Sequence, residues 1–473
     1  MSQEISPGDI LARQARALAR RQPHESGWRD AYDHVLPRPG MQADLYDATA
    51  ADAAEQLAAS LLAELTPPWS RWFGLAPAET IAETEAGQAM AYALEGTARI
   101  LQTALDRSNF AIEMHQAFLD LVITGTGVIM VEEAPLGEAS ALRFTAIPMM
   151  SAVLEEGPSG RLTTIFREDR HSTEEILRRF PFAELPDAVL REDAQTRHRV
   201  VEAVWPDSNG TRYAAVLAGD SPMLLAQGGF SESPFIAFRW LKAPGEIYGR
   251  GPVGKALPDI RTANRVVELV LKNASIACTG IWQAEDDGVL NPATIKLTPG
   301  AIIPKAPGSA GLTPLAAPGN FDVSQLVLND LRARIRTALL ADRLNAPRDA
   351  RMTATEVLER SAETARLLGA TYGRLQTELL TPMIARCLAI LARRGEVPPV
   401  LLDGQGARLR YESPLARVQG RADAANTLLF LDAVAKIGGA AAAQVDAAAA
   451  TRWLARTLGA PAEVLVPLLP PAA

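Results

Sequence analysis

The chain has 473 residues, of which 48% are hydrophobic and 22% are charged, and its formal net charge at pH 7 is -8. This length and balance predict a folded protein of two or three domains. The acidic charge argues against a protein that holds nucleic acid by bulk electrostatic attraction, because such domains are normally basic. The two cysteines lack CxxC spacing, so neither a disulfide framework nor a zinc site is predicted.

No membrane segment is expected, because the sequence lacks a run of about 18 uncharged apolar residues. The N-terminus also lacks the apolar core of a signal peptide. The five histidines are scattered, and neither an HExxH nor a GxSxG motif occurs. No metal site, cofactor or catalytic centre is therefore predicted.

The first 40 residues favour two short helices. We expect one over Asp9 to Gln22, ended by Pro23, and a second that begins near Ser26. The first carries regularly spaced arginines, for which a solvated face is the favoured interpretation: Arg13, Arg16, Arg20 and Arg21. A third helix, rich in alanine and leucine, should end at Pro67 and Pro68.

Aromatic residues follow those prolines, and we interpret Trp69, Trp72 and Phe73 as core anchors. From residue 85 to 120 the pattern is helical again, with a break near Asn109. Gly125 and Gly127 then predict a corner between a helix and a strand. Short strands are expected over residues 143–167 and in the segments HRVVEAVWP, TRYAAVLA and PFIAFRWL, with a short helix between them whose capping box is Ser172 and Glu175. As far as Lys242 they should form a sheet of five or more strands flanked by helices.

A segment that resembles a phosphate-binding loop begins at Gly249, with Gly254 and Lys255 at nearly the required spacing. Ala256 stands where that motif needs a serine or threonine hydroxyl for magnesium. Pro252 also removes one of the N–H groups that would bind phosphate. A nucleotide-binding enzyme is therefore kept as an alternative and is not the favoured reading.

Two amphipathic helices are predicted on either side of a segment rich in proline and glycine. They cover residues 254–278 and 321–341, and the intervening residues 279–320 should form a compact non-helical insertion. Asp286 and Asp287 lie in this insertion, where a turn is favoured over a calcium loop because the other oxygen ligands are missing. The layout is that of a helical hairpin with a cap.

A long helix is expected from Thr353 to about Arg394. Thr353 and Glu356 form a capping box, Gly395 supplies the stop, and Pro382 should bend the helix. A simple coiled coil is an alternative for this segment. The polar residues 342–352 before it should form a surface loop, and two further helices are expected over residues 421–437 and 444–457.

Several short sequence motifs, in this order, resemble those of the head-to-tail connector, or portal protein, of short-tailed bacteriophages. They are PPWSRWF from Pro67, YGRGP from Tyr248, TATEV from Thr353, RLQTELLTPMIAR from Arg374 and YESPLARVQ from Tyr411. The resemblance implies an α+β, mainly helical portal fold. It implies these parts: a wing (residues 1–250), a stem helix (251–279), a clip (280–320), a second stem helix (321–341), a tunnel loop (342–352), a long wing helix (353–395) and a crown with C-terminal helices (396–473).

The resemblance also implies a function without enzymatic activity. Such proteins form a ring, commonly of twelve copies, at one vertex of the capsid in the virion, and double-stranded DNA is packaged and ejected through it. Partners would be the terminase large subunit, a tail adaptor, and capsid and scaffold proteins. A structural scaffold without a channel is the other alternative.

Two groups of candidate site residues follow from the resemblance. The loop residues that would face DNA are Asp342, Arg343, Arg348, Asp349 and Arg351, although an ordinary solvated loop would also fit this stretch. The clip residues that would dock the motor or tail are Trp282, Glu285, Asp286, Asp287 and Lys305.

Overall fold

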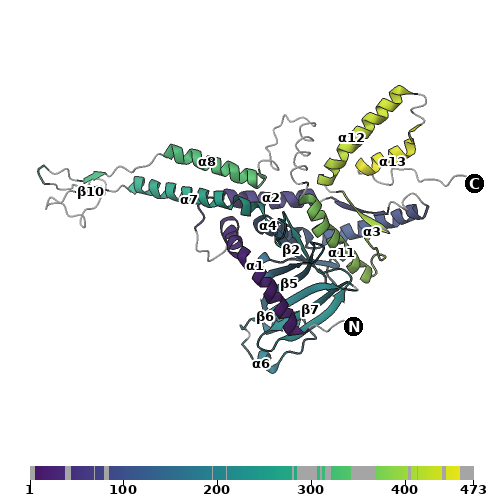
Figure 1. Cartoon of the computed structure of the whole chain (residues 1–473), viewed down its shortest axis with the longest axis horizontal. Helices are drawn as coiled ribbons and strands as arrows, with labels where there is room; N and C mark the ends of the chain where they lie inside the picture. The colour runs from purple at the N-terminus through teal and green to yellow at the C-terminus, as the bar shows by residue number, and fades with distance from the viewer. Residues whose placement is uncertain are drawn as a thin grey trace, which may run out of the picture.

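The computed structural model of the chain describes residues 6–37, 44–68, 70–78, 85–193, 195–208, 210–279, 282–284, 306–308, 312–314, 321–341, 369, 371–402, 406–412, 414–438 and 444–458. Helices and strands are mixed in a central body. Two helical arms leave that body, one built from α7 and α8 and the other from α12 and α13 (Figure 1).

A single helix, α1 (Pro7–Val35), replaces the two short N-terminal helices expected from the sequence. Pro23 lies inside it, so the prediction that this proline ends a helix is wrong. Contacts on both sides of the proline hold the helix together: Arg21 donates to the carbonyl oxygen of Ala152 at 2.7 Å, and Trp28 is buried in the core. The solvated arginine face is also wrong for Arg21, which is only 7% exposed.

The main core is formed by helices packed on a small antiparallel sheet. The sheet has the order β3-β2-β9, and its strands are β2 (Thr126–Glu133), β3 (Leu142–Ala146) and β9 (Phe235–Arg239). The helices that lead into it are α2 (Thr49–Leu65), α3 (Glu85–Arg107) and α4 (Phe110–Thr124). The break predicted near Asn109 is confirmed, because that residue separates α3 from α4.

Trp72 and Phe73 are 1% and 0% exposed, which confirms them as core anchors. They lie at the start of β1 (Phe73–Pro77), which pairs with β12 (Ala407–Tyr411) from the far end of the chain. Trp69 lies outside the described residues. The antiparallel β1–β12 pair therefore ties residues after 400 to the N-terminal part of the body.

A second, five-stranded antiparallel sheet corrects the expectation of one sheet. Its strands are β4 (Ala152–Glu156), β5 (Leu162–His171), β6 (His198–Asp207), β7 (Gly210–Ala218) and β8 (Met223–Phe230), and short helices accompany it: η1 (Met149–Ser151), α5 (Thr173–Arg179) and α6 (Asp187–Leu190). Separate apolar clusters cover its two faces, one with Ile10 of α1 and the other with Ile176 of α5. The capping box predicted at Ser172 and Glu175 is confirmed.

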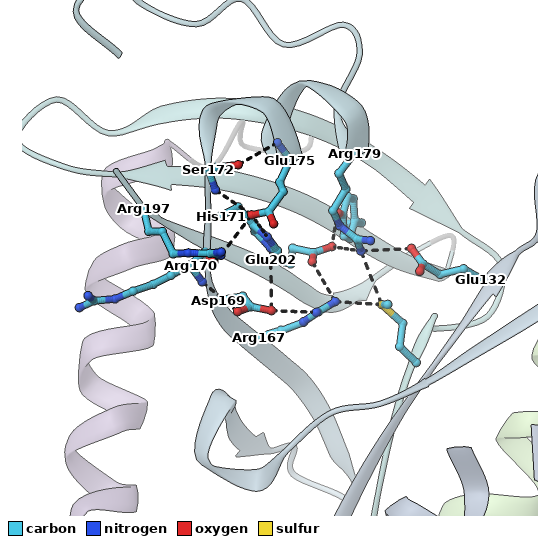
Figure 2. Close-up of polar contacts among 12 residues, drawn as sticks. Glu132, Arg167, Asp169, Arg170, His171, Ser172, Glu175, Arg179, Arg197 and Glu202 are labelled. Carbon is cyan, nitrogen blue, oxygen red and sulfur yellow. Dashed lines mark hydrogen bonds and ion pairs between the residues drawn. The ribbon is translucent and has the colours of Figure 1, made fainter. Parts of the chain in front are cut away.

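Buried charges join the two sheets (Figure 2). Glu202 on β6, only 2% exposed, accepts hydrogen bonds from Arg179 at 2.9 Å and from the Tyr213 hydroxyl at 2.6 Å. Arg179 also reaches Glu132 on β2, at 3.2 Å. Arg167 on β5 lies 3.4 Å from the same carboxylate, so removing Arg179 would take one of two guanidinium partners from a buried charge.

The helical hairpin that was predicted in the middle of the chain is present. α7 (Pro252–Thr279) and α8 (Phe321–Ala338) pack together, and the short strands β10 (Trp282–Ala284) and β11 (Leu312–Pro314) pair beyond them. Figure 1 shows that this arm points away from both sheets.

The long helix is described from Thr371 onwards, and the residues 353–368 predicted to start it lie outside the described residues. It contains a π-turn, η2 (Gln376–Leu380), and continues as α11 (Thr381–Arg393). Gly395, at φ 74°, follows its end, as predicted. The C-terminal helices are α12 (Pro414–Ile437) and α13 (Ala447–Leu458), so α12 begins seven residues before the predicted position 421.

One helix in the described part of the chain, Thr371–Arg393, has the length and composition needed to cross a membrane. Its most apolar window is 56% buried inside the protein. Leu379, Met383 and Leu391 are each 0% exposed within the main core. The helix is thus packed as a core element of the body.

Candidate functional site

Glycines fix the start of the hairpin against the body. The Gly249 N–H donates to the Thr126 hydroxyl at 2.8 Å, and a side chain at Gly251 would come within 2.6 Å of the Val122 carbonyl oxygen. Gly125, at φ 87°, faces Gly249 and Gly251 so closely that none of the three has room for a Cβ atom. The segment that resembles a phosphate loop is therefore occupied by the protein's own backbone, and this packing does not favour the nucleotide-binding alternative.

Tyr248, which precedes this glycine contact, connects α7 to the second sheet. Its side chain is 1% exposed, and its hydroxyl accepts the backbone N–H of Leu154 on β4 at 3.1 Å. Its ring makes an edge contact with Trp28 of α1, with ring centroids 5.2 Å apart. The start of α7 is consequently held by both sheets and by α1.

The root of the hairpin, where α7 and α8 adjoin the body, has an apolar core. On α7, Ile260 and Ala263 are 3% and 1% exposed. On α8, Ile335 is 1% exposed and Leu339, just after the helix, is 0% exposed. These residues recur at helical spacing and face each other, while α2 packs across α8.

Polar contacts among Asn264, Asp47 and Arg332 also hold the root, and we call them the brace. Asn264 on α7 accepts the backbone N–H groups of Tyr46 at 2.6 Å and Asp47 at 3.1 Å. Asp47, whose side chain is 3% exposed, accepts from Arg332 on α8 and from the Thr49 N–H, at 2.8 and 3.0 Å. Burial acts to raise the pKa of Asp47, but the hydrogen bonds from Thr49 and Arg332 outweigh it and lower the pKa.

The distal half of the hairpin has no such cover. From Leu269 to Ser275 no described side chain of α7 is buried, and Leu271 is 52% exposed. On α8, Leu326 is 72% and Val327 is 44% exposed. Charged side chains on α7 pair along the helix itself, as in the contact of Glu268 with Lys272 at 2.6 Å. Leu328 on α8 is buried, but these apolar side chains remain largely open to solvent in the described part of the chain.

The α12–α13 arm also exposes apolar side chains to solvent. Large apolar side chains on α12 are exposed: Leu428 by 50%, Leu429 by 68%, Phe430 by 56% and Ile437 by 73%. Three of them are consecutive, and successive helix positions are about 100° apart. They therefore point to different sides of α12, and its partner α13 cannot cover them all.

One of the candidate site residues, Trp282, lies in the described part of the chain. The structure puts Trp282 in β10, where its backbone is paired with that of Pro314. The residues outside the described part of the chain are Glu285, Asp286, Asp287, Lys305, Asp342, Arg343, Arg348, Asp349 and Arg351. Among the described residues, no group of three or more His, Cys, Asp or Glu side chains could hold a metal ion.

Sequence reasoning missed the residues that brace the root. Asn264 and Arg332 each lie more than 200 positions from their partners at residues 46 and 47. A polar residue on an otherwise apolar helical stripe was the available signal for Asn264. For Arg332 the sequence offers no signal that separates it from the neighbouring solvent-exposed Arg334 and Arg336.

Comparison with known protein families gives a match over most of the chain. A family model described as "Bacteriophage head to tail connecting protein" matches residues 8–465. The chain belongs to this family. The expected resemblance to head-to-tail connectors is thereby confirmed.

Individual proteins also match over most of their length. The chain is 26% identical to the "Probable portal protein" of Bordetella phage BPP-1, covering 99% of this chain and 90% of that protein. It is 25% identical to the "Portal protein" of Salmonella phage epsilon15, covering 97% and 88%. Among solved structures, a chain of "Virion of native gene transfer agent (GTA) particle" gives a TM-score of 0.37 at 13% identity, covering 91% of this chain and 92% of that one.

Proposed function

We propose that this chain is the subunit of a closed ring that surrounds a DNA channel at the head-to-tail junction of a phage particle. Two arms with uncovered apolar side chains carry the proposal. A well-packed body combined with exposed Leu326 and Phe430 is the pattern of a subunit that completes its core with neighbours. A closed ring of head-to-tail contacts covers both sides of every arm and leaves no free end.

The parts of the chain take the following roles in this proposal. Residues 1–250 are the wing, 251–279 and 321–341 the stem, 280–320 the clip, 342–352 the tunnel loop, 353–395 the long wing helix and 396–473 the crown. Twelve copies would form the ring in the virion. The clip would dock the terminase large subunit and the tail adaptor, and the wing would meet capsid and scaffold proteins.

The charge of the chain fits a channel through which DNA passes without being held. Each copy adds a formal charge of -8, so the ring repels the phosphate backbone overall. The tunnel-loop arginines would give only weak, local phosphate contacts, because Asp342 and Asp349 lie beside them in the sequence.

Electron micrographs of the purified protein, together with native mass spectrometry, test the proposal. The expected result is a closed ring with a central opening and a mass many times that of one chain, 50.6 kDa. Monomers or dimers at every protein concentration would contradict it. Rods or compact dimers in the images would instead favour the scaffold alternative.

A further inference from the structure

The long helix changes its hydrogen-bond pattern where it meets β9. In the π-turn Gln376–Leu380 the N–H of Thr381 donates to the carbonyl oxygen of Gln376, five residues earlier. The same oxygen accepts from the Thr381 hydroxyl at 2.9 Å and from the Tyr411 hydroxyl at 3.1 Å. Pro382 follows and has no N–H to donate. A π-turn holds one residue more than an α-turn, so it offsets the two halves of the helix by one position.

The half of the helix after the π-turn is fastened to the body. Arg386, 3% exposed, donates to the carbonyl oxygens of Val131 at 3.2 Å and Glu232 at 3.3 Å, and its guanidinium lies 4.5 Å from the ring centre of Phe230. Arg394 donates to Glu133 at 2.9 Å. This half therefore cannot rotate without breaking several buried contacts.

A buried arginine, Arg239, contacts the π-turn from the side of β9. Arg239 at the end of β9 is 0% exposed, and its guanidinium donates to Glu378 at 2.6 and 3.1 Å, while its backbone N–H donates to the same carboxylate at 3.0 Å. Its remaining guanidinium N–H groups reach the carbonyl oxygens of Gly160 and Ile247, at 2.9 and 3.1 Å. Arg239 is thus fixed from several sides, and Glu378 is the helix carboxylate that it meets. Arg374, one turn earlier on the same helix, also donates to Glu378, at 3.1 Å.

We propose that the π-turn is a joint between two helix registers and that Arg239 is the positioning residue that selects the π register. Glu378 meets Arg239 because the extra residue of the π-turn turns it toward β9. Loss of that contact allows the turn to revert to an α-turn. Reversion shifts the helix before Gln376 by one position, about 1.5 Å along and 100° around its axis, while α11 stays in place.

The proposal has a consequence for DNA passage that rests on the proposed function. Residues 342–352 precede this helix in the sequence, so a change in its register is expected to alter DNA retention. Arg239 also contacts Gly160 in the turn between β4 and β5 and Ile247 just before α7. A change in either the second sheet or the hairpin would therefore reach the same arginine.

Amide hydrogen exchange on the assembled full-length protein tests the joint. Glu378→Gln keeps the shape of the side chain but removes its charge. We expect exchange to rise at least about tenfold over residues 371–380, the equivalent of about 1.4 kcal/mol, with less than a twofold change over 383–393. Deletion of Thr377, which is exposed, removes the extra residue and should lower exchange below that of the unmodified protein.

Control variants separate the joint from an ordinary ion pair. Arg239→Lys keeps the charge but loses the fork that meets the carboxylate, and should show an intermediate rise in exchange. If Glu378→Gln fails to fold, the double variant Arg239→Met/Glu378→Leu removes both charges and should show the same local rise. Equal increases on both sides of Pro382, or none, would overturn the proposal.

A second readout uses particles. Glu378→Gln is expected to leave ring assembly intact and to reduce the amount of DNA retained. If the unmodified protein forms no ring, the proposed function fails while the exchange result still stands. If rings and DNA retention are unaffected by a variant that loosens residues 371–380, the joint exists but has no part in DNA passage, and the inference is overturned at that step.

Discussion

The root and the distal half of the α7–α8 hairpin are built from the same two helices but are stabilised in different ways. At the root, Ile260 and Ile335 are buried and Asp47 and Asn264 close the polar edge. In the distal half, Leu271 and Leu326 are more than half exposed. The amphipathic pattern is continuous, so the difference lies in what covers it. One chain supplies the cover at the root, and other copies supply it further out in the proposed ring.

The largest expected effect comes from charges placed on the distal half. Leu326→Asp combined with Val327→Asp should abolish ring formation, because each contact between copies would then have to bury two carboxylates that have no partner. The thermal midpoint of the monomer should change little, since neither residue is buried. Mass photometry and thermal unfolding measure the two quantities. The matched variant Leu326→Met/Val327→Ile keeps the surface apolar and should still form rings, whereas rings in the charged variant would show that the distal half is solvated.

Shortening a buried side chain at the root should lower the stability of the subunit without preventing ring assembly. Ile335→Ala removes a side chain that is 1% exposed and should lower the free energy of unfolding by about 2–5 kcal/mol. Protein that remains folded should still assemble. Urea unfolding checks the first expectation, with Leu326→Ala as the control that should cost less than about 0.5 kcal/mol. Similar costs for the two variants would remove the distinction between root and distal half.

The brace at the root predicts a pH dependence. Because the pKa of Asp47 is lowered in the folded protein, its contribution to stability is fully present above the unfolded value, near 3.9, and is lost as the pH falls through the folded value. Asp47→Asn should cost about 2 kcal/mol at pH 7. The difference in unfolding free energy between the two proteins should shrink below pH 4. A constant difference down to pH 2 would contradict the assigned role.

The smallest effect is expected from the loop after the hairpin. Replacing Arg343, Arg348 and Arg351 with alanine should leave ring assembly unchanged and weaken DNA retention in particles, more at low salt than at high salt. Quantifying retained DNA across a salt series measures this. Failure to form rings would identify these arginines as interface ion pairs, and unchanged retention would make the loop a solvated connector.

The parts of the fold that follow from local patterns could be predicted from the sequence. The hairpin helices, the capping box at Ser172 and the glycine corner at Gly125 depend on residues a few positions apart. α1 was divided wrongly because the contacts of Arg21 and Trp28, which hold the helix together around Pro23, come from distant segments. β8 was not predicted, since Gly228 and Gly229 weaken its strand pattern.

The features that position the candidate site depended on long-range pairs. Arg239 and Glu378 are separated by 139 positions, and nothing local distinguishes either from a surface charge. Pro382 was predicted to bend the long helix, and the structure has a π-turn just before it, at Gln376–Leu380. The π-turn was not predicted, because partners such as Tyr411 lie outside the helix sequence.

The glycine contact between Gly125 and Gly249 also fixes the direction in which α7 leaves the body. α7 has 28 residues, so it extends about 42 Å from Pro252. If α7 tilted by about 5° at this contact, its far end would move by roughly 4 Å, about the width of a methyl group. A single added methyl at Gly249 or Gly251 would force a displacement of this kind, because backbone atoms already fill the space. The three glycines thereby determine the direction of the whole α7–α8 arm relative to the body.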